Sequence, residues 1–254
     1  MSSTTLVGKI AIVTGASAGI GKAIAELLVK NGAIVAGIAR RVEHVCQHAQ
    51  ELAGEKGSLH GYQCDLTKKD DILAAFKKIN TELGPISILI NNAGALKMSG
   101  IIEGDIEKWQ AVVDTNLMAA AICIREAVAS MKANSIKGHL ININSMAGHI
   151  VPDYPKFGFY PSTKFGLRAL TETVRLEINR EKLPIKITNV SPGYVETDIV
   201  ALAYGEFAKD ETWSAITAKG LDVIDIANAV LYVVNTPERV NVTQLTVVRQ
   251  GNFL

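Results

Sequence analysis

The sequence predicts a single α/β domain in which a doubly wound, mostly parallel sheet of seven strands carries helices on both faces. Short β-rich runs alternate with longer helical stretches along all 254 residues. Several runs are continuously apolar, which is typical of strands covered by helices on both sides. Because no repeat, linker or low-complexity tract marks a boundary, we expect residues 1–254 to form one domain.

The seven predicted strands recur along the chain with helical patterns between them, as repeated β-α-β units require. Stretches 21–31 and 70–83 are two of these helical patterns, and 48% hydrophobic residues supply enough material for a large core. The strands are predicted at residues 9–14, 33–39, 59–64, 86–91, 138–143, 185–190 and 244–248.

The first strand runs directly into a glycine-rich turn, TGASAGIG, which opens a helix. Glycines permit a tight turn and let the backbone approach a pyrophosphate, while the N–H groups at the helix start attract the anion. The alternative is an ordinary β–α connection that needs a left-handed glycine. Placed after the first strand, the turn predicts a dinucleotide site formed by Gly15, Ser17, Ala18, Gly19, Ile20 and Gly21.

The second strand ends where a dinucleotide fold usually inspects the adenosine ribose. Ala39 takes the place of an acidic residue, and Arg40 and Arg41 follow it. Two guanidinium groups without a competing carboxylate suit a 2′-phosphate, so the sequence favours NADP over NAD. Ser17 could add a hydrogen bond to that phosphate. The alternative is that both arginines are a solvated helix start.

Residues 108–132 are predicted to form one long helix whose apolar side chains wrap around much of its circumference. One face of a sheet cannot cover all of them. Either the helix is unusually buried within the monomer or part of it meets another subunit, and we favour the second.

Tyr160 and Lys164 lie one helical turn apart, and Ser145 follows the fifth predicted strand. At that spacing a helix places a phenol and an ammonium group on one face, so the cation can favour the phenolate. The Ser145 hydroxyl could hold a substrate oxygen beside the phenol, as oxidation of an alcohol or reduction of a carbonyl requires. The alternative is a solvated lysine beside a half-buried tyrosine.

Residues 193–220 form the only long break in regularity that the sequence predicts. Connections of this length in a compact domain often bind ligands. The break contains the aromatic residues Tyr194, Tyr204, Phe207 and Trp213.

Six motifs along the chain resemble those of the short-chain dehydrogenase/reductase family, in the family's order. They are TGASAGIG, NNAG at 91–94, Asn116 in DTNL, Ser145, YPSTK and PGYVET. The resemblance implies a Rossmann domain with a cofactor half at about 1–145 and a catalytic and substrate half at about 146–254. It implies a nicotinamide enzyme, for which we expect NADP.

The resemblance also implies a role for each matching residue. Tyr160 would be the general acid/base, and Lys164 would lower its pKa and anchor the nicotinamide ribose. Ser145 would orient the substrate oxygen, and Asn116 would hold a water in a proton relay. The resemblance also implies further cofactor contacts: Asp65 and Leu66 would flank the adenine, and Asn92, Ala93 and Gly94 would line the middle of the cofactor. Val195 and Thr197 would meet the carboxamide.

Each of those cofactor positions also has a purely structural explanation. Asp65 could cap a turn, the NNAG motif could stabilise the central strand, and Pro192-Gly193 could end a strand.

Within the family, the chain is similar to an NADP-dependent, farnesol dehydrogenase-like branch known from insects. ARR at 39–41, DTNL, the aromatic late loop and the ending TPERVNVTQLTVVRQ carry this narrower resemblance. It implies a terpenoid or allylic alcohol or its carbonyl form, although apolar loop residues also pack without binding anything. The candidate pocket residues are Leu96, Met98, Met146, Tyr154, Phe157, Phe159, Tyr194, Tyr204, Phe207 and Trp213.

Two departures from the family pattern concern the segment before the catalytic helix. The stretch from Ser145 to Tyr160 is about two residues longer than expected, which could reshape the substrate pocket. Pro161 follows Tyr160, and proline is readily accommodated in the first turn of a helix.

The remaining alternatives for the function are an NAD-dependent dehydrogenase of another secondary alcohol, such as a steroid, and a non-catalytic nucleotide-sensing protein.

Composition argues against several other classes of function. A net charge of +1 gives no electrostatic reason to expect nucleic acid or an acidic membrane as a partner. The three cysteines have no CxxC spacing, so we expect neither disulfides nor a metal site. MSSTTLVGK lacks the features of a secretion signal and no run is long enough to span a bilayer, so we expect a cytoplasmic protein. We expect a homodimer or homotetramer that acts on an apolar alcohol or carbonyl.

Overall fold

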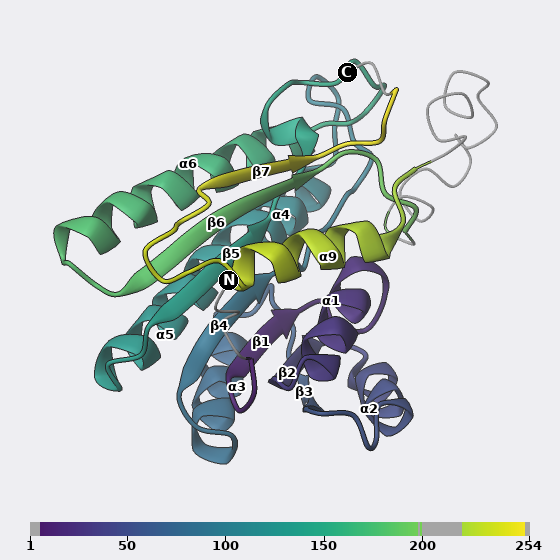
Figure 1. Ribbon diagram of the computed structural model, residues 1–254. Coiled ribbons are helices and arrows are strands. Elements are labelled where there is room, and N and C mark those ends of the chain that lie inside the picture. The colour runs from purple at the N-terminus through teal and green to yellow at the C-terminus, as the bar shows by residue number, and fades with distance from the viewer. Residues whose placement is uncertain (1–5, 198, 200–219, 252–254) are drawn as a thin grey trace.

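The computed structural model of the protein describes residues 6–197, 199 and 220–251. Their strands form one sheet in the order β3-β2-β1-β4-β5-β6-β7, and every neighbouring pair is parallel. This confirms the predicted seven-stranded, doubly wound sheet (Figure 1). The strands are β1 (Ile10–Thr14), β2 (Ile34–Ala39), β3 (Ser58–Gln63), β4 (Ile86–Asn91), β5 (Gly138–Ile143), β6 (Ile185–Pro192) and β7 (Gln244–Val247).

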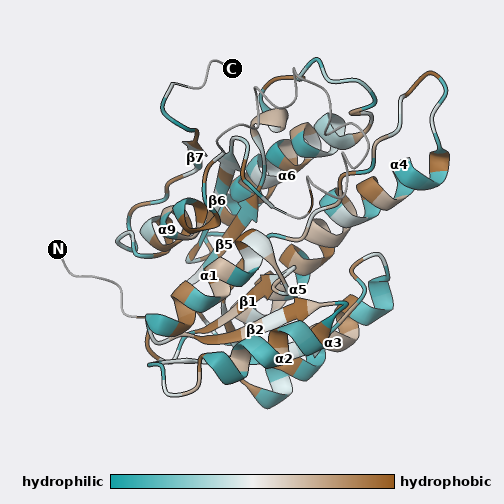
Figure 2. Ribbon diagram, turned by 90° about the vertical axis from the view of Figure 1, so that its right-hand side faces the viewer, coloured by the Kyte–Doolittle hydropathy of each residue, from teal (hydrophilic) through white to brown (hydrophobic). Residues whose placement is uncertain are grey.

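Helices cover both faces of the sheet, as Figure 1 shows. One core joins buried side chains of α1, α2 and α9 to the sheet, and a second core joins those of α3, α5 and α6 to the other face. In Figure 2 the strands are largely hydrophobic, whereas the outer sides of the helices are hydrophilic. The helices are α1 (Gly19–Lys30), α2 (Val42–Glu51), α3 (Lys69–Glu82), α4 (Ile106–Val113), α5 (Ala119–Ala133), α6 (Tyr160–Arg180) and α9 (Val223–Val234).

The order of the strands reverses at β1, which pairs with β2 on one side and β4 on the other. In an open parallel sheet, a crevice forms outside the carboxyl ends of the strands at such a reversal, and ligands bind there. The loops after β1 and β4 meet at this point, so the glycine-rich turn lies next to residues 92–94.

The predicted continuous helix over 108–132 is wrong in one respect, because a π-helical turn interrupts it. The chain forms α4, then the π-helix η1 (Asp114–Met118), then α5. Asn116 lies in this turn, where its side chain bonds to Ala95 and Thr163 on other segments. Single π turns inside α-helices are frequent at functional sites. The periodic pattern of apolar residues does not reveal this turn, because the hydrogen bonds of Asn116 that accompany it join residues far apart in the sequence.

The prediction of one long irregular segment is also wrong, because residues 92–105 and 144–159 are two further ones. Only a short 3-10 helix, η2 (Met146–Gly148), interrupts the second. The two segments bond to each other, with Ser99 N donating to Lys156 O at 2.8 Å. Their backbone groups are satisfied by tertiary contacts rather than by regular structure. Of the late loop's aromatic residues, Tyr204, Phe207 and Trp213 lie outside the described residues.

No helix among the described residues combines the length and the apolar character that crossing a membrane requires. Within the same residues, no group of three or more histidine, cysteine or acidic side chains could hold a metal ion. Cys64 and Cys123 are buried free thiols, and Cys46 is an exposed one.

Candidate active site

The carboxyl edge of the sheet brings Ser145, Tyr160 and Lys164 together. Ser145 follows the end of β5 and is the N-cap of η2, where its Oγ accepts a hydrogen bond from Ala147 N at 3.1 Å. Tyr160 is the first residue of α6, and Pro161 next to it fits the first turn because no helical bond needs its missing N–H. Helix α6 therefore begins at Tyr160, the residue predicted to be the general acid/base.

The Tyr160 phenol lies close enough to Ser145 for that hydroxyl to lower its pKa. Lys164 lies one turn further along the helix, with its Nζ 5.6 Å from the centre of the Tyr160 ring. Its side chain is buried and donates to the carbonyl of Ile143 at 3.0 Å. A serine hydroxyl, a phenol and a buried amine thus form one constellation built from β5 and α6.

Burial dominates the protonation of these groups. It raises the pKa of the Tyr160 phenol, and the hydrogen bond with Ser145 offsets only part of this. Burial also lowers the pKa of Lys164 to about 8, so the amine remains mostly charged at pH 7. The expected lowering of the tyrosine pKa therefore does not arise from the protein's own groups. Desolvation of the phenol outweighs the effect of Ser145 on its pKa.

Asn116 connects the loop after β4 to the helix that carries Tyr160. Its Oδ1 accepts from Ala95 N at 2.7 Å, and its Nδ2 donates to Ala95 O at 2.9 Å and to Thr163 Oγ1 at 3.1 Å. Thr163 Oγ1 in turn donates to the carbonyl of Tyr160 at 2.7 Å. The Asn116 side chain is 2% exposed and its bonds join three segments. Sequence reasoning missed Thr163, although it lies within the YPSTK motif.

The glycine-rich turn presents bare backbone at the start of α1. Gly15 and Gly19 have φ angles of +68° and +55°, which other residues adopt only with strain. A Cβ at Gly21 would overlap the carbonyl of Gly15 and the amide of Asn92. The N-cap Ala18 offers no side-chain bond, and no acidic residue lies in the first turn. Unpaired N–H groups without a competing carboxylate fit an anionic phosphate.

Thr14 joins the glycine-rich turn to the NNAG motif. Its Oγ1 accepts from the backbone N–H groups of Asn92 and Ala93, both at 3.0 Å. The Asn92 side chain donates back to Thr14 O at 2.9 Å and to Gly15 O at 3.3 Å. These bonds confirm the structural explanation of NNAG as a motif that supports the central strands. Sequence reasoning missed Thr14, which opens the turn.

Arg40 and Arg41 are exposed at the end of β2, while Ala39 before them is buried. The carboxylate of Asp65, after β3, accepts from Thr67 N at 3.1 Å and from Thr67 Oγ1 at 2.8 Å, so it caps a turn. Burial by itself would raise the pKa of Asp65. The hydrogen bonds from Thr67 and the positive charge of Arg40 have the larger combined effect, so the pKa lies below its ordinary value. Arg40 and a carboxylate held by a turn therefore lie near each other, at the edge of the sheet where the adenosine of a dinucleotide would bind.

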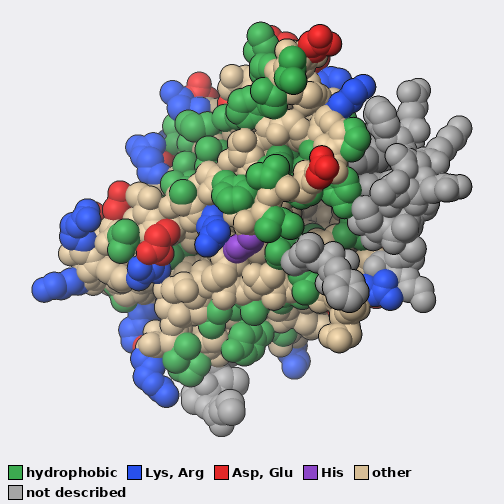
Figure 3. Space-filling model, turned by 90° about the horizontal axis from the view of Figure 1, so that it is seen from above, with side chains coloured by type: hydrophobic (Ala, Val, Ile, Leu, Met, Phe, Trp, Pro, Cys, Tyr) green, Lys and Arg blue, Asp and Glu red, His purple; other side chains and the backbone are tan. Residues whose placement is uncertain are grey.

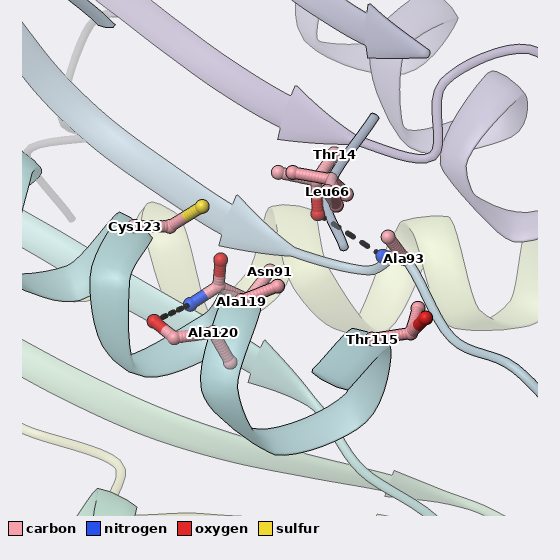
Figure 4. Close-up of a pocket in the computed structure, with 8 residues that line it drawn as sticks. All are labelled: Thr14, Leu66, Asn91, Ala93, Thr115, Ala119, Ala120 and Cys123. Carbon is pink, nitrogen blue, oxygen red and sulfur yellow. Dashed lines mark hydrogen bonds between the residues drawn. The ribbon is translucent and has the colours of Figure 1, made fainter. Parts of the chain in front are cut away.

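A small pocket is lined by two of the predicted cofactor contacts, Leu66 and Ala93, and does not include Tyr160. It opens between the ends of β1 and β4 and the start of α5, and Figure 4 shows Leu66 and Ala93 on its wall. Its lining consists of Thr14, Leu66, Asn91, Ala93, Thr115, Ala119, Ala120 and Cys123.

Val195 and Thr197, the predicted contacts to the carboxamide of the cofactor, lie beside the glycine-rich turn. Val195 is buried and bridges to Leu221, while Thr197 Oγ1 bonds to Val195 O at 3.4 Å. A Cβ built on Gly19 would stand 3.4 Å from Thr197 Cγ2, so residues 195–197 reach the start of α1.

Aromatic side chains continue from Tyr160 into the segment before it. The Phe157 ring lies 5.2 Å from that of Tyr160 and 5.6 Å from that of Tyr154, between ring centres. Phe159 contacts Trp109 on α4, with the ring centres 5.5 Å apart. The longer segment therefore places aromatic faces directly against the phenol. Figure 3, which views the molecule from above, shows several groups of hydrophobic side chains on the upper surface, among polar and charged ones.

Comparisons with known proteins agree with this geometry. The short chain dehydrogenase family model matches residues 9–205. The chain is 41% identical to farnesol dehydrogenase of Aedes aegypti, covering 94% of this chain and 95% of that protein. It is 41% identical to dehydrogenase/reductase SDR family member 11 of Gallus gallus, covering 92% and 93%.

Solved structures give the same result. A short-chain type dehydrogenase/reductase from Mycobacterium marinum matches with a TM-score of 0.87 at 27% identity, covering 96% of this chain and 95% of that one. The closed form of serine dehydrogenase complexed with NADP+ matches with a TM-score of 0.85 at 28% identity, covering 96% of both chains. Since the family model covers most of the sequence and relatives align along nearly its full length, the chain belongs to the short chain dehydrogenase family.

Proposed function

We propose that the protein is an NADP(H)-dependent oxidoreductase that interconverts an apolar alcohol and its carbonyl form. One observation carries this proposal: the Tyr160 phenol lies beside the hydroxyl of Ser145 and next to the buried amine of Lys164. Family membership supports an oxidoreductase with a nicotinamide cofactor. The choice of substrate and of NADP over NAD goes beyond that membership.

The cofactor contacts that we propose follow from the bare backbone and the cations at the sheet edge. The turn from Gly15 to Gly21 would hold the pyrophosphate, and Arg40 and Arg41 would bind the 2′-phosphate. When bound, the nicotinamide accepts or donates the hydride. The further contacts that we propose are Ser17, Asp65, Leu66, Asn92, Ala93, Gly94, Val195 and Thr197.

The proton is managed by the protein's own groups. A phenol whose pKa is raised by burial stays protonated, so Tyr160 can donate to the oxygen of a carbonyl during reduction. Ser145 holds that oxygen beside the phenol. Lys164 supplies positive charge that favours the phenolate in the oxidation direction and anchors the nicotinamide ribose. Asn116 fixes the Tyr160 segment to the loop at Ala95, which positions the two halves of the site.

A terpenoid or allylic alcohol is the substrate class that we propose. The rings of Tyr154 and Phe157 extend an apolar surface outward from Tyr160, and such surfaces suit unsaturated hydrocarbon chains. The 41% identity to a farnesol dehydrogenase supports the same class. Among the described residues, the other candidates for contact with the substrate are Leu96, Met98, Met146, Phe159 and Tyr194.

The test is a substrate panel with the wild type and Tyr160→Phe. Terpenols, steroids and sugars are mixed with protein and NADP while the absorbance of reduced nicotinamide is followed. We expect terpenols to turn over, and Tyr160→Phe to lower kcat by about 10³-fold or more while the NADP Kd changes less than about twofold. Tyr232→Phe, which removes a hydroxyl from an exposed tyrosine of α9 outside the proposed contacts, is the matched control.

Each failure of this test has its own meaning. Turnover of steroids alone would replace the substrate class. Binding of NADP without turnover of any alcohol or carbonyl would favour a nucleotide-sensing protein. Unchanged activity in Tyr160→Phe would show that another group carries the proton.

A further inference from the structure

The hydroxyl of Ser191 has three polar neighbours and is completely buried near the end of β6. Asn189 Nδ2 donates to Ser191 Oγ at 3.2 Å, and Gln244 Nε2 donates to the same oxygen at 3.0 Å. His149 Nε2 is the third neighbour, at 2.8 Å. Asn189 Nδ2 also donates to Gln244 Oε1 at 2.7 Å, which fixes how the two amides face each other.

Hydrogen-bond counting assigns the charge state of His149. A hydroxyl has one proton to donate and two lone pairs that accept. The two amide groups occupy both lone pairs of Ser191, so its proton is left for the third neighbour. With the two amides oriented in this way, His149 Nε2 is the acceptor, which requires a neutral ring that carries its proton on Nδ1.

The surroundings of His149 favour the same neutral form. The residue is partly buried, and its only charged influence among the described groups is the cation Arg168 on α6. Burial first, and then this positive charge, lower the pKa of His149. On β6 the ring bonds to the uncharged Ser191, whose other partners, Asn189 and Gln244, are uncharged as well.

His149 lies in the segment between Ser145 and Tyr160. It follows η2 directly, and its backbone N donates to Met146 O at 2.9 Å. Ser145 caps that same short helix, and residues 150–159 lead from His149 to Tyr160. The imidazole thus fastens a segment without regular structure to the buried Ser191 near the end of β6.

We propose that neutral His149 is a positioning residue, which holds Ser145 and the segment before Tyr160 in place through Ser191. Protonation of the ring would aim an N–H at an oxygen that has no lone pair left. The bond would break, and the segment between Ser145 and Tyr160 would lose its anchor. This inference rests on the proposed function, since it concerns the placement of the same catalytic groups.

The sign of the pH dependence follows from this charge state. The folded protein disfavours the protonated ring, so the anchor is complete above the ordinary histidine pKa of about 6.5. It is lost as the pH falls through the lower pKa of His149 in the folded protein. Turnover should therefore decline on the acid side for a reason separate from the titration of Tyr160.

The kinetic test compares His149→Gln with His149→Lys. Glutamine can accept from Ser191 through its Oε1 and does not titrate, so we expect kcat within about twofold of wild type at pH 8 and a smaller acid decline between pH 7 and 5. Lysine cannot accept, so kcat should fall roughly 10- to 100-fold at every pH, the size of effect that misplacement of catalytic groups produces. NADP Kd should change little in either variant. His44→Gln, on the exposed part of α2, is the control.

A second measurement needs no turnover and separates this inference from the proposed function. Nitrogen-15 NMR of the wild type at pH 7.5 should show His149 neutral with its proton on Nδ1. A proton on Nε2, a charged ring at that pH, or an unchanged acid decline in His149→Gln would each overturn the proposal. If the NMR result holds while no substrate turns over, the proposed function fails and the assignment of His149 as a neutral anchor stands.

Discussion

At the scale of single residues, Lys164 shows how a functional group can oppose stability. Its amine is buried, with Ile143 O as its hydrogen-bond acceptor, and burial lowers its pKa from 10.5 to about 8. The folded protein therefore disfavours the charged form that it holds at pH 7. Retention of such a group suggests that the site needs its charge for the proposed chemistry.

We predict that Lys164→Met abolishes activity and changes the pH dependence of stability. Because the pKa is lower in the folded state, wild-type stability should rise as the pH increases from about 8 towards 10.5. The difference in Tm between wild type and Lys164→Met should move in favour of the wild type between pH 7 and 9.5. Thermal unfolding measures this, with the exposed Lys69→Met as the control. A difference that is constant with pH would contradict the prediction.

Arg40 decides the proposed choice between the two nicotinamide cofactors. We predict that Arg40→Ala raises the NADP Kd by about 10- to 100-fold and leaves the NAD Kd unchanged, because only NADP has a 2′-phosphate for the guanidinium group. Titration calorimetry with both cofactors measures the ratio. Arg239→Ala, which removes an arginine outside the proposed cofactor contacts, is the control. Equal weakening of both cofactors would mean that Arg40 supports the fold instead.

At the scale of elements, the start of α1 depends on close approach between backbones. A Cβ at Gly21 would overlap Gly15 O and Asn92 Nδ2, whereas one at Gly100 would meet nothing within 4 Å. Gly21→Ala therefore forces apart the turn and the loop after β4.

We predict that Gly21→Ala lowers stability by roughly 1–3 kcal/mol and raises the NADP Kd at least about tenfold, because overpacking displaces the turn. Gly100→Ala should leave both quantities unchanged. Chemical unfolding and NADP titration of the two variants measure this. A Gly21→Ala protein with wild-type NADP affinity would show that this turn does not hold the phosphate.

The interrupted helix from α4 to α5 is the element that sequence reasoning described least well. Of its apolar side chains, Val112 and Ile124 are buried, whereas Met118 is 49% exposed. On α6, Phe165 and Leu176 are exposed as well, and their spacing of eleven residues places them on one face. Burial within the monomer thus accounts for part of the apolar surface and leaves part of it in solvent.

At the scale of the whole molecule, the oligomeric state remains a prediction. We expect a homodimer or homotetramer in which exposed apolar side chains of η1 and α6 are covered by a second copy. Sedimentation velocity should give a multiple of the 27.2 kDa chain mass, and the combined change Phe165→Glu and Leu176→Glu should produce monomers. Tyr232→Glu, on the exposed side of α9, is the control. A wild-type monomer would refute the expectation.

Much of the fold was predictable because the relevant information is local. Each predicted strand agrees with an observed one to within about two residues, since continuous apolar runs and the turns that bound them are properties of neighbouring residues. The spacing of Tyr160 and Lys164 likewise requires only the geometry of one helix. The roles proposed for these residues came from the family resemblance and await the experiments above.

The sequence by itself determined the order of the elements, the glycine-rich turn and the residues that meet at the edge of the sheet. Tertiary structure alone decided the π turn at Asn116, the two extra irregular segments, the raised pKa of Tyr160 and the bonds around His149. Each of these depends on contacts between segments far apart in the chain. Desolvation and hydrogen-bond satisfaction are set by such contacts, and a periodic pattern in the sequence does not contain them.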